Sequence, residues 1–213
     1  MTNRSMDRRS QRTRRMLKKG LEELLQEKPF SQITIHDITD RMDMHRSTFY
    51  LHYPNTHALL QELEDDVLSD AQAMVDQHRH EITHGTLRPI FQPILQYIAK
   101  NQILFVSLFA NNDSSSFVVQ VEQLIYKNGS SLILQLYPNA PKEKMDYLLG
   151  FLASGLIGLI KTWFESERKL SQEDLVSMAD QMVNAVCQEL FGECSSAPLS
   201  RGDWTSPLEV HSL

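Results

Sequence analysis

The sequence predicts an all-α protein, with a small N-terminal three-helix bundle that contains a helix-turn-helix, followed by a larger α-helical domain. Apolar residues recur at the three- and four-residue spacing of amphipathic helices along almost the whole chain, and no segment keeps the alternation typical of a β-strand. The chain has 213 residues, of which 41% are hydrophobic and 23% charged. This composition is sufficient for a buried core and argues against global disorder.

Capping residues and proline or glycine breaks predict where the helices begin and end. The first helix should end before Pro29, because proline disfavours helical geometry in the preceding residue. Thr34 is expected to cap the second helix, with Asp37 where a capping box usually has Glu or Gln, and Asn55 is expected to cap the fourth. Asp43 lies in the turn between the two short helices. We expect helices at 8–27, 35–42, 46–53, 56–80, 86–110 with an interruption near residue 100, 117–136, 142–166 and 172–191.

The predicted domains are a helix-turn-helix unit at 1–54, a larger helical domain at 55–194, and a flexible tail at 195–213. The basic N-terminus has no apolar segment behind it, so we expect no signal peptide and a cytoplasmic protein. The apolar run 148–160 has 13 residues, fewer than the roughly 20 that cross a membrane, and it is interpreted as part of a buried helix. Cys187 and Cys194 form no CxxC pair, so no disulfide framework is expected.

Charge is distributed unevenly between the two ends of the chain. Residues 1–53 carry a net charge of +4 and residues 54–213 a net charge of −10, which gives −6 overall. Eight basic residues lie in the segment 4–19. A basic end on an acidic body is typical of a protein that binds a polyanion, either nucleic acid or, less often, an anionic membrane. A solvated helix face is the alternative explanation for the same pattern.

The two short helices near the N-terminus have the spacing of a helix-turn-helix. The second helix of such a unit lies in the DNA major groove, where its first residues reach the edges of the bases. Arg46 can donate two hydrogen bonds to guanine, Ser47 and Thr48 can contact bases or phosphates, and the Tyr50 hydroxyl can donate to a phosphate. Thr34 lies at a helix N-terminus, where backbone N–H groups favour an anion.

The segment 34–60 resembles the DNA-binding region of TetR-type bacterial transcriptional regulators. The resemblance rests on Thr34, Asp37 and Ile38, the block RSTFY at 46–50, His52 and Tyr53, and Leu59. Three positions depart from the family pattern, because Asp43 replaces a glycine in the turn, His45 replaces Ser or Asn as the cap, and Thr56 replaces a phosphate-contacting lysine. The DNA-binding residues that we expect are Thr34, His45, Arg46, Ser47, Thr48, Tyr50, His52 and Thr56.

The segment 154–175 resembles the C-terminal domain of one TetR branch, which includes the regulator of a dihydroxyacetone kinase operon. The resemblance implies a homodimer in which the last two long helices of each subunit form a four-helix bundle. The spacing of Gly150, Ser154 and Gly158 agrees, because these small residues lie on one line where another helix can approach. The expected dimer interface comprises Gly150, Ser154, Gly158, Leu175, Met178, Met182 and Val186.

The resemblance also implies a cavity for a small-molecule effector, although aromatic residues at helical spacing are more often plain core. Its candidate lining is Phe91, Leu95, Phe105, Phe109, Phe117, Phe151 and Trp163. The sequence has none of the familiar catalytic or nucleotide-binding motifs and no cluster of metal ligands, so we expect no enzyme activity, no cofactor and no metal.

The sequence therefore predicts a homodimeric, ligand-responsive regulator of transcription that binds double-stranded DNA at a palindromic operator, with repression the commoner sign in the family. Two alternatives remain open at this point. One is a helical adaptor or co-regulator with weakened DNA binding that acts through a partner protein, which Asp43 and Thr56 favour. The other is a peripheral membrane protein that uses its basic arm. The sequence does not identify the operator, the regulated genes or the effector.

Overall fold

The computed structural model describes residues 3–82, 85–110 and 115–192, and all of the regular elements within these ranges are helices. The elements are α1 (Asn3–Leu25), η1 (Phe30–Gln32), α2 (Ile35–Arg41), α3 (Arg46–Tyr50), α4 (Thr56–His78), η2 (Arg79–Glu81), α5 (Arg88–Lys100), α6 (Gln102–Ala110), α7 (Ser115–Leu136), α8 (Lys142–Glu165) and α9 (Gln172–Phe191). The all-α prediction is confirmed. The flexible tail expected at 195–213 and Cys194 lie outside the described residues.

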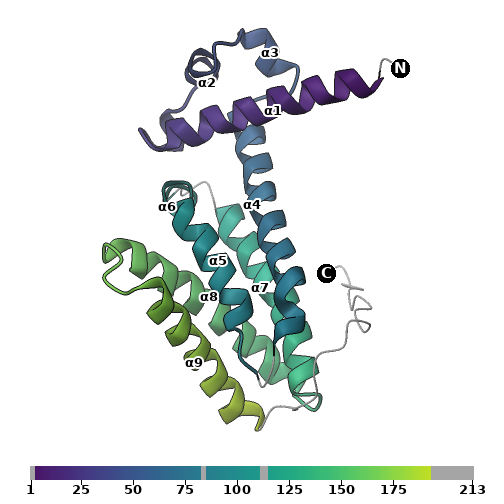
Figure 1. The fold of residues 1–213 in the computed structure, drawn as a ribbon, viewed down its shortest axis with the longest axis vertical. Helices are drawn as coiled ribbons and strands as arrows, with labels where there is room; N and C mark the ends of the chain where they lie inside the picture. The colour runs from purple at the N-terminus through teal and green to yellow at the C-terminus, as the bar shows by residue number, and fades with distance from the viewer. Residues whose placement is uncertain (1–2, 83–84, 111–114, 193–213) are drawn as a thin grey trace.

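The helices form a small head and a larger body (Figure 1). Helices α1, α2 and α3 make up the head, and the long α4 runs from the head into the body beside α5 and α7. Helices α7 and α8 pack together, as do α5 and α9. The short α6 lies at the end of the body that faces the head, where it contacts α1.

The core of the head consists of the apolar residues that the helical periodicity predicted. Leu17, Leu21, Ile38 and Phe49 have no exposed surface. Gly20 lies where α1 and α2 cross, and a Cβ atom there would come within 2.8 Å of the Met42 side chain. Any larger residue at position 20 would therefore force the Met42 side chain to move.

The body has an internal hydrogen-bond network that joins α9 to the start of α5. Asp180 on α9 is buried and accepts hydrogen bonds from the Leu87 backbone N–H at 2.6 Å, the Thr86 hydroxyl at 2.9 Å and the Asn184 side-chain amide at 3.2 Å. An ionised carboxylate placed at a helix N-terminus satisfies backbone N–H groups that the helix itself leaves free. The Asp180 carboxylate therefore fixes the position of α5 against α9.

Helix α8 is longer than the 13-residue apolar run on which the sequence interpretation rested. It has 24 residues, and its length and composition would allow it to cross a membrane, although only one third of its most apolar window is buried within the subunit. Its buried side packs on α7 in the body. Its opposite side, with Tyr147 at 83% and Phe151 at 65% exposure, is left uncovered.

Candidate nucleic-acid interface and effector cavity

The helix-turn-helix begins with a capping box at the first residue of α2. The Thr34 side chain accepts a hydrogen bond from the Asp37 backbone N–H at 3.2 Å, and the Asp37 carboxylate accepts from the Thr34 backbone N–H at 2.7 Å. Lys28 forms an ion pair with the same carboxylate at 2.9 Å. The Lys28 ammonium, followed by the Thr34 backbone and hydroxyl groups, holds the pKa of Asp37 well below its ordinary value. The cap expected from the sequence is confirmed and includes an ion pair that was not predicted.

The turn between α2 and α3 uses Asp43 in the left-handed conformation that glycine usually adopts. Asp43 has a φ of 50°, and the turn closes through a hydrogen bond from the Met44 backbone N–H to the Thr39 carbonyl at 2.8 Å. Asp is among the few residues besides glycine that enter this region at modest cost. The departure at this position is therefore accommodated, and the two helices keep the arrangement of a helix-turn-helix.

Helix α3 presents a polar face to solvent and is held by a single buried aromatic residue. Phe49 is fully buried, whereas His45, Arg46, Ser47 and Tyr50 are exposed. Among the described residues, the Arg46 guanidinium has no ion pair or hydrogen bond, so it is available to a ligand. Of the other residues expected at the interface, Thr34 is exposed and Thr48, His52 and Thr56 are half-buried.

The Thr34 hydroxyl is already used within the protein. It donates to the Asp37 carboxylate at 2.7 Å while it accepts from the Asp37 backbone. Its one proton is therefore committed, and a phosphate, which can only accept hydrogen bonds, would have to replace Asp37. Thr34 consequently acts as a helix cap in this structure.

Among the described basic residues of the N-terminal segment, Arg14 and Lys18 bind α4, and Lys19 pairs with Glu23 of its own helix at 3.7 Å. Arg14 pairs with Glu62 on α4 and donates a hydrogen bond to the Tyr53 hydroxyl at 3.3 Å, while its guanidinium lies 5.4 Å from the centre of the Tyr53 ring. Lys18 pairs with Glu62, at 3.1 Å, and with Asp66. We call the charged side chains of Arg14, Lys18, Glu62 and Asp66 the α1–α4 clamp. The clamp could not be predicted from the sequence because its partners are 48 residues apart in the chain.

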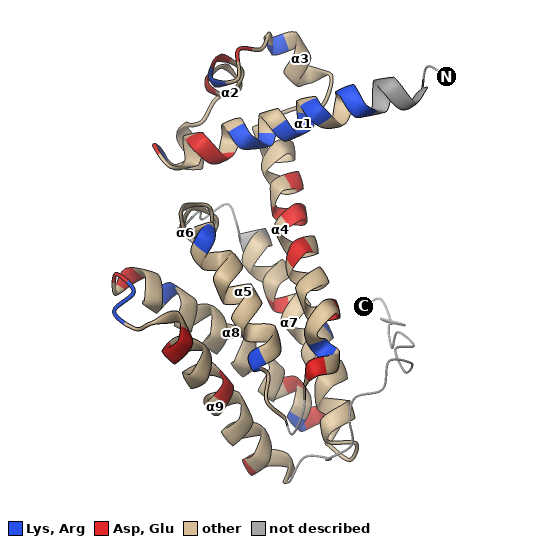
Figure 2. Cartoon of the chain, in the orientation of Figure 1, with Lys and Arg blue, Asp and Glu red and all other residues tan. Residues whose placement is uncertain are grey.

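The remaining described arginines of α1 point into solvent. Arg8, Arg9, Arg12 and Arg15 are exposed, and none of them forms an ion pair with a described residue. Figure 2 shows basic residues along α1 and acidic residues along the upper half of α4, directly below the head. The free arginines and Arg46 give the head an electropositive surface that suits a polyanion.

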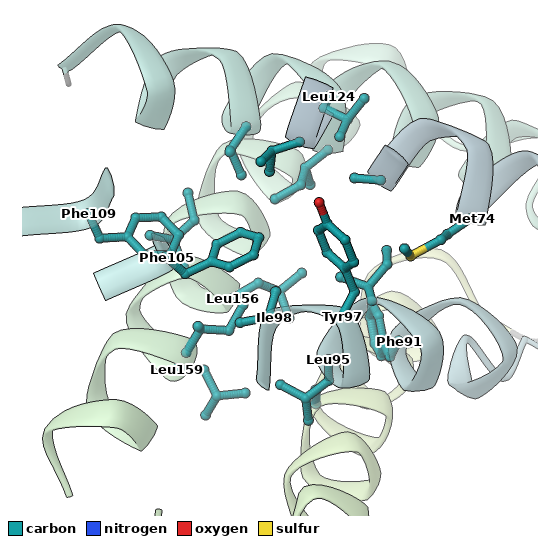
Figure 3. A pocket seen from close by; sticks show the side chains of 18 of the residues that line it. Met74, Phe91, Leu95, Tyr97, Ile98, Phe105, Phe109, Leu124, Leu156 and Leu159 are labelled. Carbon is teal, nitrogen blue, oxygen red and sulfur yellow. The ribbon is translucent and has the colours of Figure 1, made fainter. Parts of the chain in front are cut away.

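A cavity of about 160 Å³ lies inside the body, between α4, α5, α6, α7, α8 and α9. Five of the seven residues expected to line an effector cavity are part of the lining of this cavity, namely Phe91, Leu95, Phe105, Phe109 and Phe117. In Figure 3, Phe105 and Phe109 lie at one end of the cavity and Phe91 and Met74 at the other. The ring of Tyr97 also lines the cavity.

Phe151 and Trp163 do not line this cavity. Phe151 is 65% exposed on the uncovered side of α8, and Trp163 is buried against Leu175 and Val176 of α9, with its indole N–H donating to the Leu170 carbonyl at 2.9 Å. Phe151 follows Tyr147 by four residues and therefore shares its helix face. The four-residue spacing between Tyr147 and Phe151 is the sequence signal that could have distinguished Phe151 from the residues that line the cavity.

The residues expected at a dimer interface differ in how much of their surface is exposed. Gly150, Ser154 and Met182 are exposed, and a Cβ atom built at Gly150 or Gly158 would meet no other atom within 4 Å. Met178 and Val186 are half-buried, and Leu175 is buried inside the subunit. The expectation for Leu175 is therefore wrong for this subunit, because its side chain packs in the core with Trp163 and leaves no surface for a partner.

A helix-turn-helix with a solvent-facing second helix, joined to a helical body with an internal apolar cavity, defines a DNA-binding regulator of transcription. Residues 19–63 match the family described as "Bacterial regulatory proteins, tetR family", and residues 85–185 match the family described as "Transcriptional regulator C-terminal region". The chain belongs to the TetR family of transcriptional regulators. The resemblance inferred from the sequence is confirmed.

Known proteins agree with this assignment. The chain is 46% identical over 59 residues to YxbF, an uncharacterized HTH-type transcriptional regulator of Bacillus subtilis, and this match spans 27% of the chain but only 16% of YxbF. A TetR transcriptional regulator from Streptococcus agalactiae is 27% identical, with a TM-score of 0.65, over 84% of this chain and 97% of the other. DhaS, a dihydroxyacetone kinase operon activator, is 19% identical with a TM-score of 0.62, over 84% of this chain and 98% of DhaS. The likeness to DhaS shows the shared fold.

Proposed function

We propose that this protein is a homodimeric regulator that binds a palindromic operator through the two α3 helices and is released from it by a small ligand. The observation that carries the proposal is the exposure of Arg46, Ser47 and Tyr50 on a helix anchored by the buried Phe49. These side chains can reach base edges and phosphates, while the exposed arginines of α1 add sequence-independent attraction to the backbone.

The uncovered side of α8 supports a two-fold dimer. Large apolar side chains of Tyr147 and Phe151 lie there beside the small residues Gly150 and Ser154, and Met182 of α9 is 54% exposed. Contiguous exposed apolar surface of this kind marks an interaction site on a water-soluble domain. A two-fold pairing of this face would bury it and would present two heads to one palindromic duplex.

Helix α6 connects the cavity to the head and gives the proposed release a physical route. Its Phe105 and Phe109 line the cavity, and Phe105 and Leu108 belong to the same core cluster as Leu21 and Leu25 of α1. Ser107 also donates a hydrogen bond to the Leu25 carbonyl at 3.2 Å. A ligand that binds one position of α6 more tightly than another would therefore shift the position of α1 and with it the head.

We assign repression as the sign of regulation, as the commoner mode in the family. The structural relatives include both signs, since DhaS is an operon activator and SmeT of Stenotrophomonas maltophilia, 14% identical with a TM-score of 0.63 over 92% of this chain and 96% of SmeT, is a repressor of a multidrug efflux pump. A reporter gene placed behind the bound site decides the sign, because deletion of a repressor raises its expression.

Selection of bound sequences from random duplex DNA tests the proposal. We expect enrichment of a palindrome of about 15–30 base pairs, with half-sites about one helical turn or a multiple apart, and binding that weakens steeply with salt. The Lys127→Ala variant removes a positive charge from an exposed position of α7 in the body. It serves as the control for variants that remove a positive charge from the head. Equal, weak binding to every sequence would refute operator recognition and would favour an adaptor that acts through a partner protein.

A further inference from the structure

A second cavity adjoins the first, and the two share part of their lining. The second has a volume of about 140 Å³ and lies towards the other end of the body, between α4, α5, α7, α8 and α9. The side chains common to both cavities are those of Phe91, Ile94, Leu124, Ile125 and Leu156, which we call the neck. Phe91, Leu124 and Leu156 are labelled in Figure 3. The two cavities are therefore adjacent chambers, and the side chains that lie between them are apolar.

The first chamber offers a ligand almost no polar contact. Its described lining contains no charged side chain, and its only side-chain polar atoms are the Met74 sulfur and the Tyr97 hydroxyl. That hydroxyl donates its proton to Asp70 at 3.0 Å. Burial, followed by the neighbouring Asp70 carboxylate, raises the pKa of Tyr97, so its ring remains neutral. The first chamber is suited to hydrocarbon.

The second chamber has the polar side chains of Asn128, Tyr137, Asn184 and Cys187, and the amide groups of both asparagines already donate hydrogen bonds within the protein. The Asn128 amide group donates to the Gln72 side chain at 3.0 Å and to the Leu124 carbonyl at 2.8 Å, and its oxygen accepts from Gln72 at 3.1 Å. Asn184 donates to Asp180 at 3.2 Å. Burial raises the pKa of the Cys187 thiol to about 11, which keeps it neutral. No charged side chain lines the described part of this chamber either.

From this lining we infer that the effector is an uncharged, extended hydrocarbon ligand, such as a straight-chain alcohol, that passes the neck and occupies both chambers. The ligand class is inferred from the chambers alone. Only the expected effect of the ligand on operator binding rests on the proposed regulatory function. A charged group would lose its hydration in either chamber and find no partner there. An apolar protein cavity of about 150 Å³ holds a molecule of six carbon atoms, so the two chambers together suit a chain of about ten to twelve carbons.

Displacement of the uncharged fluorescent probe N-phenyl-1-naphthylamine from the full-length protein tests this ligand class. Primary alcohols from butanol to tetradecanol are the competitors, each matched at pH 8 with the carboxylate of the same chain length. We expect the affinity for alcohols to rise about fourfold per methylene and to level off near ten to twelve carbons. We expect each carboxylate to bind at least about tenfold more weakly than its alcohol. Equal affinity for both series, or a plateau near six carbons, would overturn the inference.

Variants at the neck test whether one ligand spans both chambers. Ile94→Trp, and independently Leu156→Phe, should narrow the passage and lower the affinity for dodecanol at least about tenfold, while that for hexanol changes less than about threefold. Leu134→Trp, on α7 with 43% exposure and outside both linings, should change neither. Circular dichroism checks that each variant folds. Equal losses for hexanol and dodecanol in both folded neck variants would contradict a single spanning ligand.

Operator binding in the presence of dodecanol separates this inference from the proposed function. The displacement assay contains no DNA, so a protein that fails to recognise an operator can still confirm the ligand class. If dodecanol binds as expected and operator affinity falls at least about tenfold, the inferred ligand class and the proposed release from the operator are both supported. If dodecanol binds and operator affinity is unchanged, the chambers hold hydrocarbon but the assignment of that ligand as the effector is refuted.

Discussion

Removal of the Asp37 carboxylate should destabilise the protein in a pH-dependent manner. Asp37 closes the capping box of α2 through the Thr34 backbone and pairs with Lys28 at 2.9 Å. In Asp37→Asn, the ion pair is lost and the cap is weakened. A helix cap contributes about 0.5–2 kcal/mol, and a partly exposed ion pair contributes less than about 1 kcal/mol. We therefore expect the free energy of unfolding to fall by about 1–2 kcal/mol at pH 7.

The sign of the pH dependence follows from the lowered pKa of Asp37 in the folded protein. A carboxyl group whose pKa is lowered by folding stabilises the protein fully above its unfolded pKa of about 3.9, and this contribution declines as the pH falls below that value. At pH 3.5 the difference between the parent protein and Asp37→Asn should be smaller than at pH 7 by about 0.7 kcal/mol, because the unfolded carboxyl group is by then mostly protonated.

Urea unfolding at one fixed protein concentration, followed by circular dichroism, measures the free energy of unfolding at pH 7 and at pH 3.5. The concentration must be held constant, because dimerisation contributes to the apparent stability. Asp40→Asn is the matched control, since it removes the same charge from an exposed position of the same helix and no cap depends on its side chain. If the two variants are equally stable at pH 7, or if the deficit of Asp37→Asn grows as the pH falls, the role assigned to the Asp37 carboxylate is wrong.

Four further substitutions test the interface, the dimer and the body. Arg46→Ala should reduce discrimination between operator and mismatched sites by about 1–3 kcal/mol, whereas Tyr50→Phe should weaken binding to all sites alike, as measured by titration with both duplexes. Phe151→Asp should raise the dimer dissociation constant at least about 100-fold in sedimentation, because each dimer loses two buried rings, each worth about 1.5–3 kcal/mol; an unchanged constant would exclude this face. Asp180→Ala should lower the free energy of unfolding by about 2–4 kcal/mol, since the half-buried donors on Thr86 and Leu87 lose their buried acceptor; a loss below about 1 kcal/mol would contradict that role.

Local features of the fold could be predicted from the sequence because their causes lie within a few residues. The caps at Thr34 and Asn55 each accept the expected backbone hydrogen bond, and the interruption near residue 100 separates α5 from α6. Helix α3 ends at Tyr50, earlier than the expected 53, because the following residues form a turn that leads to the buried Tyr53.

The features that could not be predicted depend on contacts between distant segments. The pairing of Arg14 and Lys18 with α4 required knowledge of how α1 crosses α4, and without it both residues were counted with the DNA-facing charge. Trp163 has the composition of a cavity residue, yet the packing of α9 on α8 places it in a separate core cluster. The cavity residues on α5, α6 and α7 were identified because aromatic residues are abundant there, but their arrangement around one space follows only from the tertiary structure.

The basic residues of α1 and the acidic residues of the upper part of α4 (Figure 2) form an electric dipole between the head and the body. In the field of a DNA duplex, such a dipole experiences a torque that turns the arginines of α1 towards the phosphates before contact and turns the carboxylates of Asp65 and Asp66 away. A larger fraction of the encounters between protein and DNA would then have an orientation that permits binding. Added salt should therefore lower the association rate constant by a larger factor than it changes the dissociation rate constant of the bound complex.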